Sequence, residues 1–274
     1  METPVDTDGD GRLDLIAVYI RRPLETTQGM RVPAIYVANP YMLECNEDWY
    51  VPHDVDRDVS PYPQQHITES DITFDPSTVS FPQPRYPRAT VGYADTAPTE
   101  EIPLDCISDW YSYFNSRGYA SVFCGGLGTR GSQGFNCCGS PEETAAFKAV
   151  IDWLNGRCRA FTNLTDNIEI RADWCTGKVA MSGKSYLGTM CIAVASTGVE
   201  GLETIIPEAA ISNWYDYYRC NGLNLPAIGW QGDDLDILAK YCFSRAKDPE
   251  DYASVRAAYA AWLEGIEAGE DRDS

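Results

Sequence analysis

The sequence predicts an α/β protein in which a mostly parallel sheet is covered by helices on both faces. Strand-like and helix-like segments alternate between residues 119 and 206, and the connections between them are short. Short connections between alternating strands and helices favour parallel pairing, with the helices packed on the sheet. With 274 residues, 44% of them hydrophobic, the chain is long enough to bury a large core.

The first third of the chain predicts two strands and then a long irregular segment. Residues 13–21 (LDLIAVYIR) and 32–38 (VPAIYVA) are rich in β-branched and apolar residues, as strands are. From residue 39 to about 105 the periodicity fails, and eight of the 17 prolines fall between 51 and 100. We therefore expect an irregular insertion at about 42–104, which is either functional or partly disordered.

Order returns with a helix near 106–117, stopped by Gly118, and a strand from Tyr119 to Cys124. The next helix has Ser140 as its N-cap, Pro141 at its first position and Glu143 placed to close a capping box. Apolar residues recur along that helix at i, i+3, i+4 and i+7, so one of its faces packs on the sheet. These residues are Phe147, Val150, Ile151 and Leu154.

A strand at 177–182, an apolar helix at about 186–197 and a strand at 202–206 follow. After Pro207 the strand patterns stop, and residues 211–267 have helical patterns. We expect residues 1–210 to form one sheet-containing domain and 211–274 to begin a helical cap over it.

The charge balance argues against nucleic acid and membranes as partners. The chain has 41 acidic and 21 basic residues, a formal charge of −20, which repels phosphate backbones and anionic lipids. No stretch approaches the length of a membrane span, and the start, METP, lacks the pattern of a signal peptide. The ten cysteines are scattered, so we expect buried thiols in a reducing, cytoplasmic compartment.

The segment most suggestive of chemistry is MSGKSYLG at 181–188, between a predicted strand and a predicted helix. A serine at a sharp strand-to-helix turn is thrust out of the sheet, and small neighbours permit the tight backbone. Here Ser185 is the candidate nucleophile, although Leu187 stands where the strict pattern has glycine, and Gly188 follows one residue later. An ordinary glycine-containing turn is the alternative.

Two other patterns suggest ligands but fit them poorly. Gly183-Lys184-Ser185 ends like a phosphate-binding loop, but Lys178 stands where that loop needs glycine, and the intervening residues are strand-like. Asp6, Asp8 and Asp10 begin like a calcium loop, yet Ala17 stands at the twelfth place, where a bidentate glutamate is needed. We therefore expect a polar turn there, and neither a cofactor nor a metal.

Longer phrases carry a specific resemblance. The run GKSYLGT, the following GVEGLETIIPEAAISNWYDYYRCNGL, GTRGSQG at 128–134 and the opening ETPVDTDGDGRLDL resemble the X-prolyl dipeptidyl aminopeptidase family of serine peptidases. The resemblance runs from residue 2 to about 245 and is weakest across 42–104. It implies an α/β-hydrolase-type fold that is incomplete in this chain. It also implies peptide substrates with proline second from the amino terminus, cleaved without a cofactor.

The resemblance also implies roles for particular residues. Ser185 matches the family's nucleophile, the backbone amide of Tyr186 one oxyanion donor, and the hydroxyl of Tyr41 the other. Trp214 and Tyr217 resemble the walls of the pocket for proline; aromatic packing between cap and core is the alternative. Asp233 stands where the family has an acid suited to the substrate's ammonium group, with Asp234 as a substitute and a solvated helix start as the alternative.

The triad partners of the serine are not evident. A serine nucleophile needs a histidine base, and the chain's two histidines, His53 and His66, both precede Ser185, whereas the fold's order is serine, acid, histidine. We therefore expect a fragment that is inactive by itself and, because its sheet is incomplete, capable of forming a homo-oligomer. A broader acyl or ester hydrolase and a non-catalytic binding module are the alternative functions.

Overall fold

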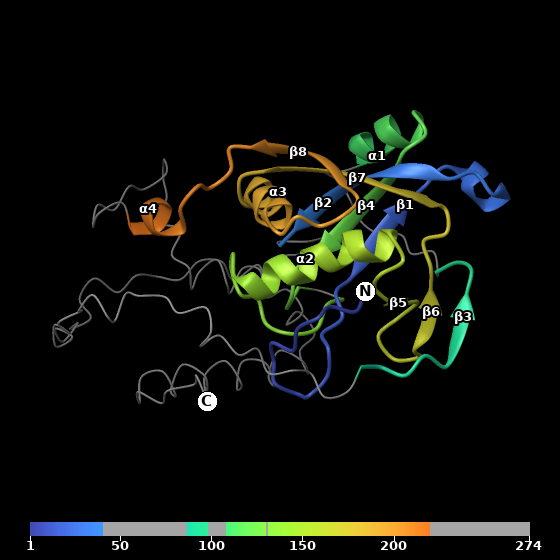
Figure 1. Ribbon diagram of the computed structural model, residues 1–274, viewed down its shortest axis with the longest axis horizontal. Helices are drawn as coiled ribbons and strands as arrows, with labels where there is room; N and C mark the ends of the chain where they lie inside the picture. Colours follow the sequence, from blue (N-terminus) through green and yellow to red (C-terminus); the bar gives the residue numbers. More distant parts are fainter. Residues whose placement is uncertain (41–86, 98–107, 130, 220–274) are drawn as a thin grey trace.

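The computed structural model describes residues 1–40, 87–97, 108–129 and 131–219 (Figure 1). A five-stranded sheet in the order β1-β4-β2-β7-β8 forms its centre. The strands are β1 (Val18–Arg21), β4 (Ala120–Gly125), β2 (Val32–Asn39), β7 (Cys175–Lys184) and β8 (Leu202–Glu208). All neighbouring pairs are parallel except β1 and β4, which confirms the mostly parallel sheet expected from the sequence.

The first predicted strand is shorter than expected. Residues 13–21 were predicted as one strand, but β1 occupies only Val18–Arg21. The preceding residues pair with the amino-terminal segment instead: the Thr3 amide donates to the Asp14 carbonyl (2.9 Å), and the Ile16 amide donates to the Met1 carbonyl (2.9 Å). Residues 13–17 therefore pair with the amino-terminal segment, and only residues 18–21 pair within the five-stranded sheet.

Among the described residues, four α-helices and one 3-10 helix accompany the sheet. They are η1 (Leu24–Gln28), α1 (Ser108–Asn115), α2 (Pro141–Leu154), α3 (Tyr186–Ser196) and α4 (Trp214–Arg219). Figure 1 shows α2 and α3 on one side of the sheet and α1 on the other. The boundaries of α2 and α3 agree with the prediction. No helix among the described residues is long and apolar enough to cross a membrane.

The capping box expected at the start of α2 forms only in part. The Ser140 hydroxyl accepts from the Glu143 amide (3.2 Å), as predicted. The Glu143 carboxylate does not return to the Ser140 amide, because that amide donates to the Cys137 carbonyl (3.0 Å). It accepts instead from the amide of Gly139, one residue earlier (2.6 Å).

A small second sheet was not predicted. It consists of β3 (Gly92–Ala94), β6 (Ile168–Ile170) and β5 (Ala160–Phe161), in that order. β3 lies inside the stretch predicted to be irregular, so that prediction is wrong for residues 92–94. Strands of two or three residues are too short to show the alternation from which strands are recognised.

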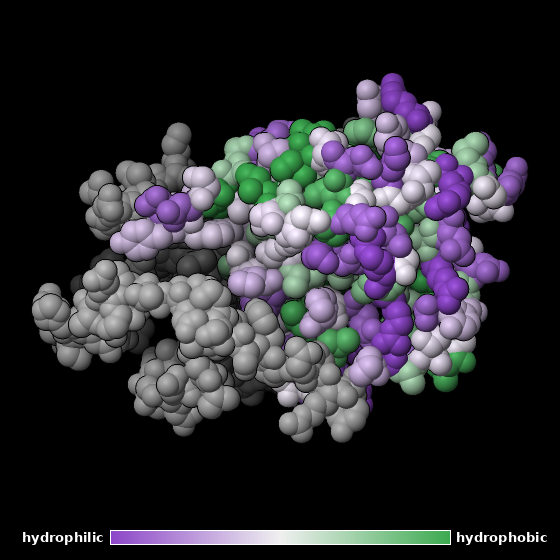
Figure 2. Space-filling view, viewed as in Figure 1, coloured by the Kyte–Doolittle hydropathy of each residue, from purple (hydrophilic) through white to green (hydrophobic). Residues whose placement is uncertain are grey.

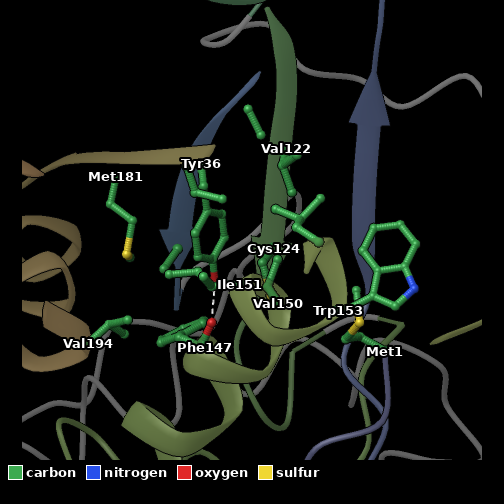
Figure 3. Packing of buried hydrophobic residues seen from close by; sticks show 14 of the residues in the cluster. Met1, Tyr36, Val122, Cys124, Phe147, Val150, Ile151, Trp153, Met181 and Val194 are labelled. Atoms are coloured by element: carbon green, nitrogen blue, oxygen red, sulfur yellow. Dashed lines mark hydrogen bonds between the residues drawn. The ribbon is translucent and has the colours of Figure 1, made fainter. Parts of the chain in front are cut away.

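The core lies between the sheet and α2 (Figure 3). Tyr36 of β2 is fully buried, and its hydroxyl donates to the Phe147 carbonyl of α2 (3.1 Å). Val122 and Cys124 of β4 line the same face, since alternate residues of a strand share a face. The six described cysteines are free thiols, and Cys124 is among the three that are buried.

The far edge of the sheet is less well covered than its centre. β8 is the last of the described strands on this side of the sheet, and Ile206 on it is 49% exposed; Ile192 on the neighbouring α3 is 44% exposed. Figure 2 shows apolar side chains gathered over α3 and β8, whereas hydrophilic side chains dominate the opposite half of that view. The homo-oligomer expected from the incomplete sheet remains a prediction.

Candidate active site

Ser185 lies at a strained turn between β7 and α3. β7 ends at Lys184, α3 begins at Tyr186, and Ser185 between them has φ 60° and ψ −121°. Such a backbone conformation costs a residue with a Cβ about 1–3 kcal/mol. The Ser185 amide donates to the Glu208 carbonyl (2.8 Å), and the Thr189 amide donates to the Ser185 carbonyl (2.9 Å). The turn leaves Ser185 exposed at the end of a buried strand.

Two glycines make this turn possible. A Cβ on Gly183 would lie 2.6 Å from the carbonyl carbon of Leu187, and one on Gly188 would lie 2.7 Å from the carbonyl oxygen of Glu208. Neither position therefore accepts a larger residue without a backbone shift. The closest approach to β8 falls at residue 188, three residues after the serine, which explains why glycine stands there and Leu187 is tolerated.

The phosphate-loop alternative is wrong. Gly177 to Lys184 belong to strand β7, so their amides pair within the sheet and cannot wrap a phosphate.

The calcium-like segment folds as a turn whose carboxylates are hydrogen-bonded: Asp6 accepts from the Gly9 and Gly11 amides (2.8 and 2.9 Å). Asp6, Asp8 and Asp14 place ligand atoms within 4.8 Å of one another, an arrangement that acidic turns also adopt without an ion.

The amide of Tyr186 is at the first position of α3, where amides have no acceptor within the helix and point toward the positive end of its dipole. Tyr41 lies outside the described residues, but the strand that leads to it is described. Tyr36 of β2 pairs in register with Met181 of β7, so Asn39 and Lys184 end their neighbouring parallel strands at the same level. The chain therefore leaves β2 at the carboxyl ends of the parallel strands, where Ser185 also lies.

The side chain of Tyr186 reveals a cluster that sequence reasoning missed. It is 1% exposed, and its hydroxyl donates to Glu143 Oε2 (2.5 Å). Glu143 is fully buried, and burial raises the pKa of its carboxyl to about 7 despite the lowering effect of hydrogen bonds from Tyr186 and Gly139. The only signal in the sequence was the capping-box spacing, which is typical of an exposed glutamate.

Trp214 packs beside the turn. Its indole lies edge-to-face on the Tyr186 ring, with centroids 5.1 Å apart and planes at 83°. Tyr217, one turn further along α4, is 48% exposed. The structure therefore brings Trp214 next to the residue that follows Ser185. Asp233, its substitute Asp234, His53 and His66 all lie outside the described residues.

A polar cleft of about 740 Å³ lies at the other end of the strands. Its lining includes Arg31 and Cys175, which flank the beginnings of β2 and β7, and the Arg31 guanidinium donates to the Cys175 carbonyl (2.5 Å). Ser185 follows the end of β7, so this cleft is separate from the serine turn.

A mostly parallel sheet in this order, with an exposed serine at a strained turn where a central strand meets a helix, defines an α/β-hydrolase-type fold. A family model described as X-Pro dipeptidyl-peptidase (S15 family) matches residues 8–274. The chain therefore belongs to the X-Pro dipeptidyl-peptidase family.

Individual relatives are much longer than this chain. It is 44% identical to the Xaa-Pro dipeptidyl-peptidase of Pediococcus pentosaceus over 100% of its own length and 34% of the relative's. It is 43% identical to that of Lacticaseibacillus casei, over 99% of its own length and again 34% of the relative's. The chain spans about a third of the curated relatives it matches. Among solved structures, a CocE/NonD family hydrolase from Staphylococcus aureus is 16% identical with a TM-score of 0.42, covering 78% of this chain and 28% of that one.

Proposed function

We propose that the full-length protein carrying this chain is a serine peptidase that releases Xaa-Pro dipeptides from the amino terminus of peptides. The observation that carries the proposal is the strained turn at Ser185, held at the carboxyl end of β7 with Trp214 beside it. Strain of this kind persists where the surrounding structure enforces it, and it is concentrated at functional sites. The relatives, which are named as Xaa-Pro dipeptidyl-peptidases, support the choice of substrate.

In this proposal the Ser185 oxygen bonds to the carbonyl carbon of the proline, and the resulting oxyanion accepts hydrogen bonds from the Tyr186 amide and the Tyr41 hydroxyl. The carbon–nitrogen bond then breaks, and the shortened peptide leaves with the proton that Ser185 gave up. Water cleaves the acyl-enzyme and releases the dipeptide. The base that carries the proton is expected from a part of the full-length protein outside this chain.

The substrate would be held by groups of two kinds. Trp214 and Tyr217 offer flat aromatic surfaces to the pyrrolidine ring of proline, which costs little conformational entropy to bind. A carboxylate, for which Asp233 is the candidate, would face the free ammonium group and so limit cleavage to dipeptides.

Three further expectations remain predictions: the division into a domain at 1–210 and a cap from 211, the cytoplasmic location, and self-association.

The test compares substrates on the full-length protein. We expect an Ala-Pro chromogenic amide to be cleaved far faster than Ala-Ala or a short acyl ester, and Ser185→Ala to abolish turnover. Ser196→Ala, at the exposed end of the same helix, is the matched control and should retain it. A serine-directed phosphonate should label Ser185 alone, as mapped by peptide mass spectrometry. Preference for the ester would refute the substrate, and no adduct at Ser185 would refute the nucleophile.

A further inference from the structure

A buried carboxylate connects the serine turn to the start of α2. Glu143 Oε2 accepts two hydrogen bonds, one from the Tyr186 hydroxyl (2.5 Å) and one from the Gly139 amide (2.6 Å). Tyr186 directly follows Ser185, and Gly139 lies just before the first turn of α2. One oxygen atom therefore links two segments that are 47 residues apart in the chain.

Both of these partners contact Trp214. The indole lies edge-to-face on the Tyr186 ring, 5.1 Å between centroids. It also occupies the space left by the missing side chain of Gly139, where an added Cβ would lie 2.4 Å from its Cε2 atom. The indole is thus in contact with two residues whose positions depend on the same oxygen of Glu143.

Helix capping alone does not explain why the Glu143 side chain is fully buried. The Ser140 hydroxyl already caps α2 by accepting from the Glu143 amide. Glu143 is nonetheless fully buried, and its second oxygen, Oε1, is buried without a hydrogen-bond partner among the described residues. Beyond the cap, the buried Oε2 atom of Glu143 joins the segment before α2 to the residue that follows Ser185.

We infer that Glu143 is a positioning residue for substrate specificity, because it holds Tyr186 and Gly139 and through them sets the position of the Trp214 indole beside Ser185. This inference rests on the proposed function, in which Trp214 forms a wall of the pocket for proline. A flat wall selects a pyrrolidine ring only if its distance from the nucleophile is constant, since the reacting atoms must meet within a few tenths of an ångström.

The kinetic test uses the full-length protein and three variants, Glu143→Ala, Tyr186→Phe and Gly139→Ala. For each, kcat and KM are measured with Ala-Pro and Ala-Ala amides. Losing a buried hydrogen bond to a carboxylate should lower kcat/KM for Ala-Pro roughly tenfold, with a smaller effect on Ala-Ala. Glu143→Gln should recover most of the preference, because its amide oxygen can still accept from both donors.

Two control variants separate positioning from stability. Tyr36→Phe removes another buried hydroxyl that bonds to α2, and Glu142→Ala alters the neighbouring glutamate. Neither change removes a hydrogen-bond partner of Glu143 Oε2, so both should keep the wild-type preference for proline. If the Glu143 and Tyr186 variants lost activity on both substrates in equal proportion, the effect would be structural and the inference would be wrong. Tyr186→Phe removes only the hydroxyl that donates to Glu143, so this variant can decide the question if Glu143→Ala does not fold.

A spectroscopic readout tests the inference without any substrate. The protein is labelled with 5-fluorotryptophan, and the ¹⁹F signal of Trp214 is assigned from its absence in Trp214→Phe. That signal should shift in Glu143→Ala and Tyr186→Phe and stay in place in Tyr36→Phe. An unmoved signal would overturn the positioning role. A shifted signal in a protein that shows no preference for proline would refute the proposed substrate and leave the positioning role standing.

Discussion

Replacing Ser185 by glycine should make the folded protein more stable than replacing it by alanine. Both changes remove the hydroxyl, so both abolish the proposed nucleophile. Alanine keeps a Cβ at φ 60° and ψ −121°, whereas glycine adopts this conformation without strain. The two variants therefore isolate the conformational energy of the turn.

The size of the difference follows from two opposing contributions. Relief of the strain should stabilise the glycine variant by about 1–3 kcal/mol. The greater freedom of glycine in the unfolded chain offsets about 0.5–1 kcal/mol of this. We expect a net difference of about 1 kcal/mol in the free energy of unfolding.

Urea unfolding of the two full-length variants, followed by circular dichroism, measures this difference. The matched control is Ala195→Gly within α3, where the order should be reversed, because glycine in a helix costs about 1 kcal/mol relative to alanine. If Ser185→Gly were no more stable than Ser185→Ala while the control behaved as expected, the turn would not be strained, and the argument for a nucleophile built on that strain would fail.

Three further predictions concern the same region. Gly188→Ala would place a Cβ 2.7 Å from the Glu208 carbonyl oxygen, so it should slow phosphonate labelling of Ser185 and destabilise the protein by about 1–3 kcal/mol, read by urea unfolding. Because burial raises the pKa of Glu143 from 4.5 to about 7, this carboxyl contributes stability that is fully present below about pH 4.5 and is lost as the pH rises through about 7. Glu143→Gln should flatten that part of the pH–stability curve, and an unchanged curve would contradict the pKa shift. Tyr36→Phe should lower the free energy of unfolding by about 1 kcal/mol, and a neutral result would show that its hydroxyl bond to α2 adds no net stability.

Much of the fold was predictable because its signals are local. Pro141, the Ser140 cap and the apolar period determine α2, and the apolar run after Ser185 determines α3. The paired strands β2 and β7 were also predicted, since their β-branched and apolar residues are contiguous. The small sheet of β3, β5 and β6 was not, because such short strands form only where a partner strand is already in place.

The sequence alone also located the serine turn, since a strand, a small-residue turn and a helix are consecutive in the chain. It did not show that β1 would begin at Val18, because residues 13–17 could pair equally well inside the sheet. Pairing with the first five residues decided the matter, and that contact depends on how the two segments meet in space.

By itself, then, the sequence determined the alternation of strands and helices, the family and the candidate nucleophile Ser185. Only the tertiary structure decided that Glu143 would be buried beneath the serine turn and that Trp214 would rest against Tyr186 and Gly139. The physical reason is distance along the chain. Caps, turns and periodic faces are set by neighbours a few residues apart, whereas this cluster depends on the sheet order that brings α2, α3 and α4 together.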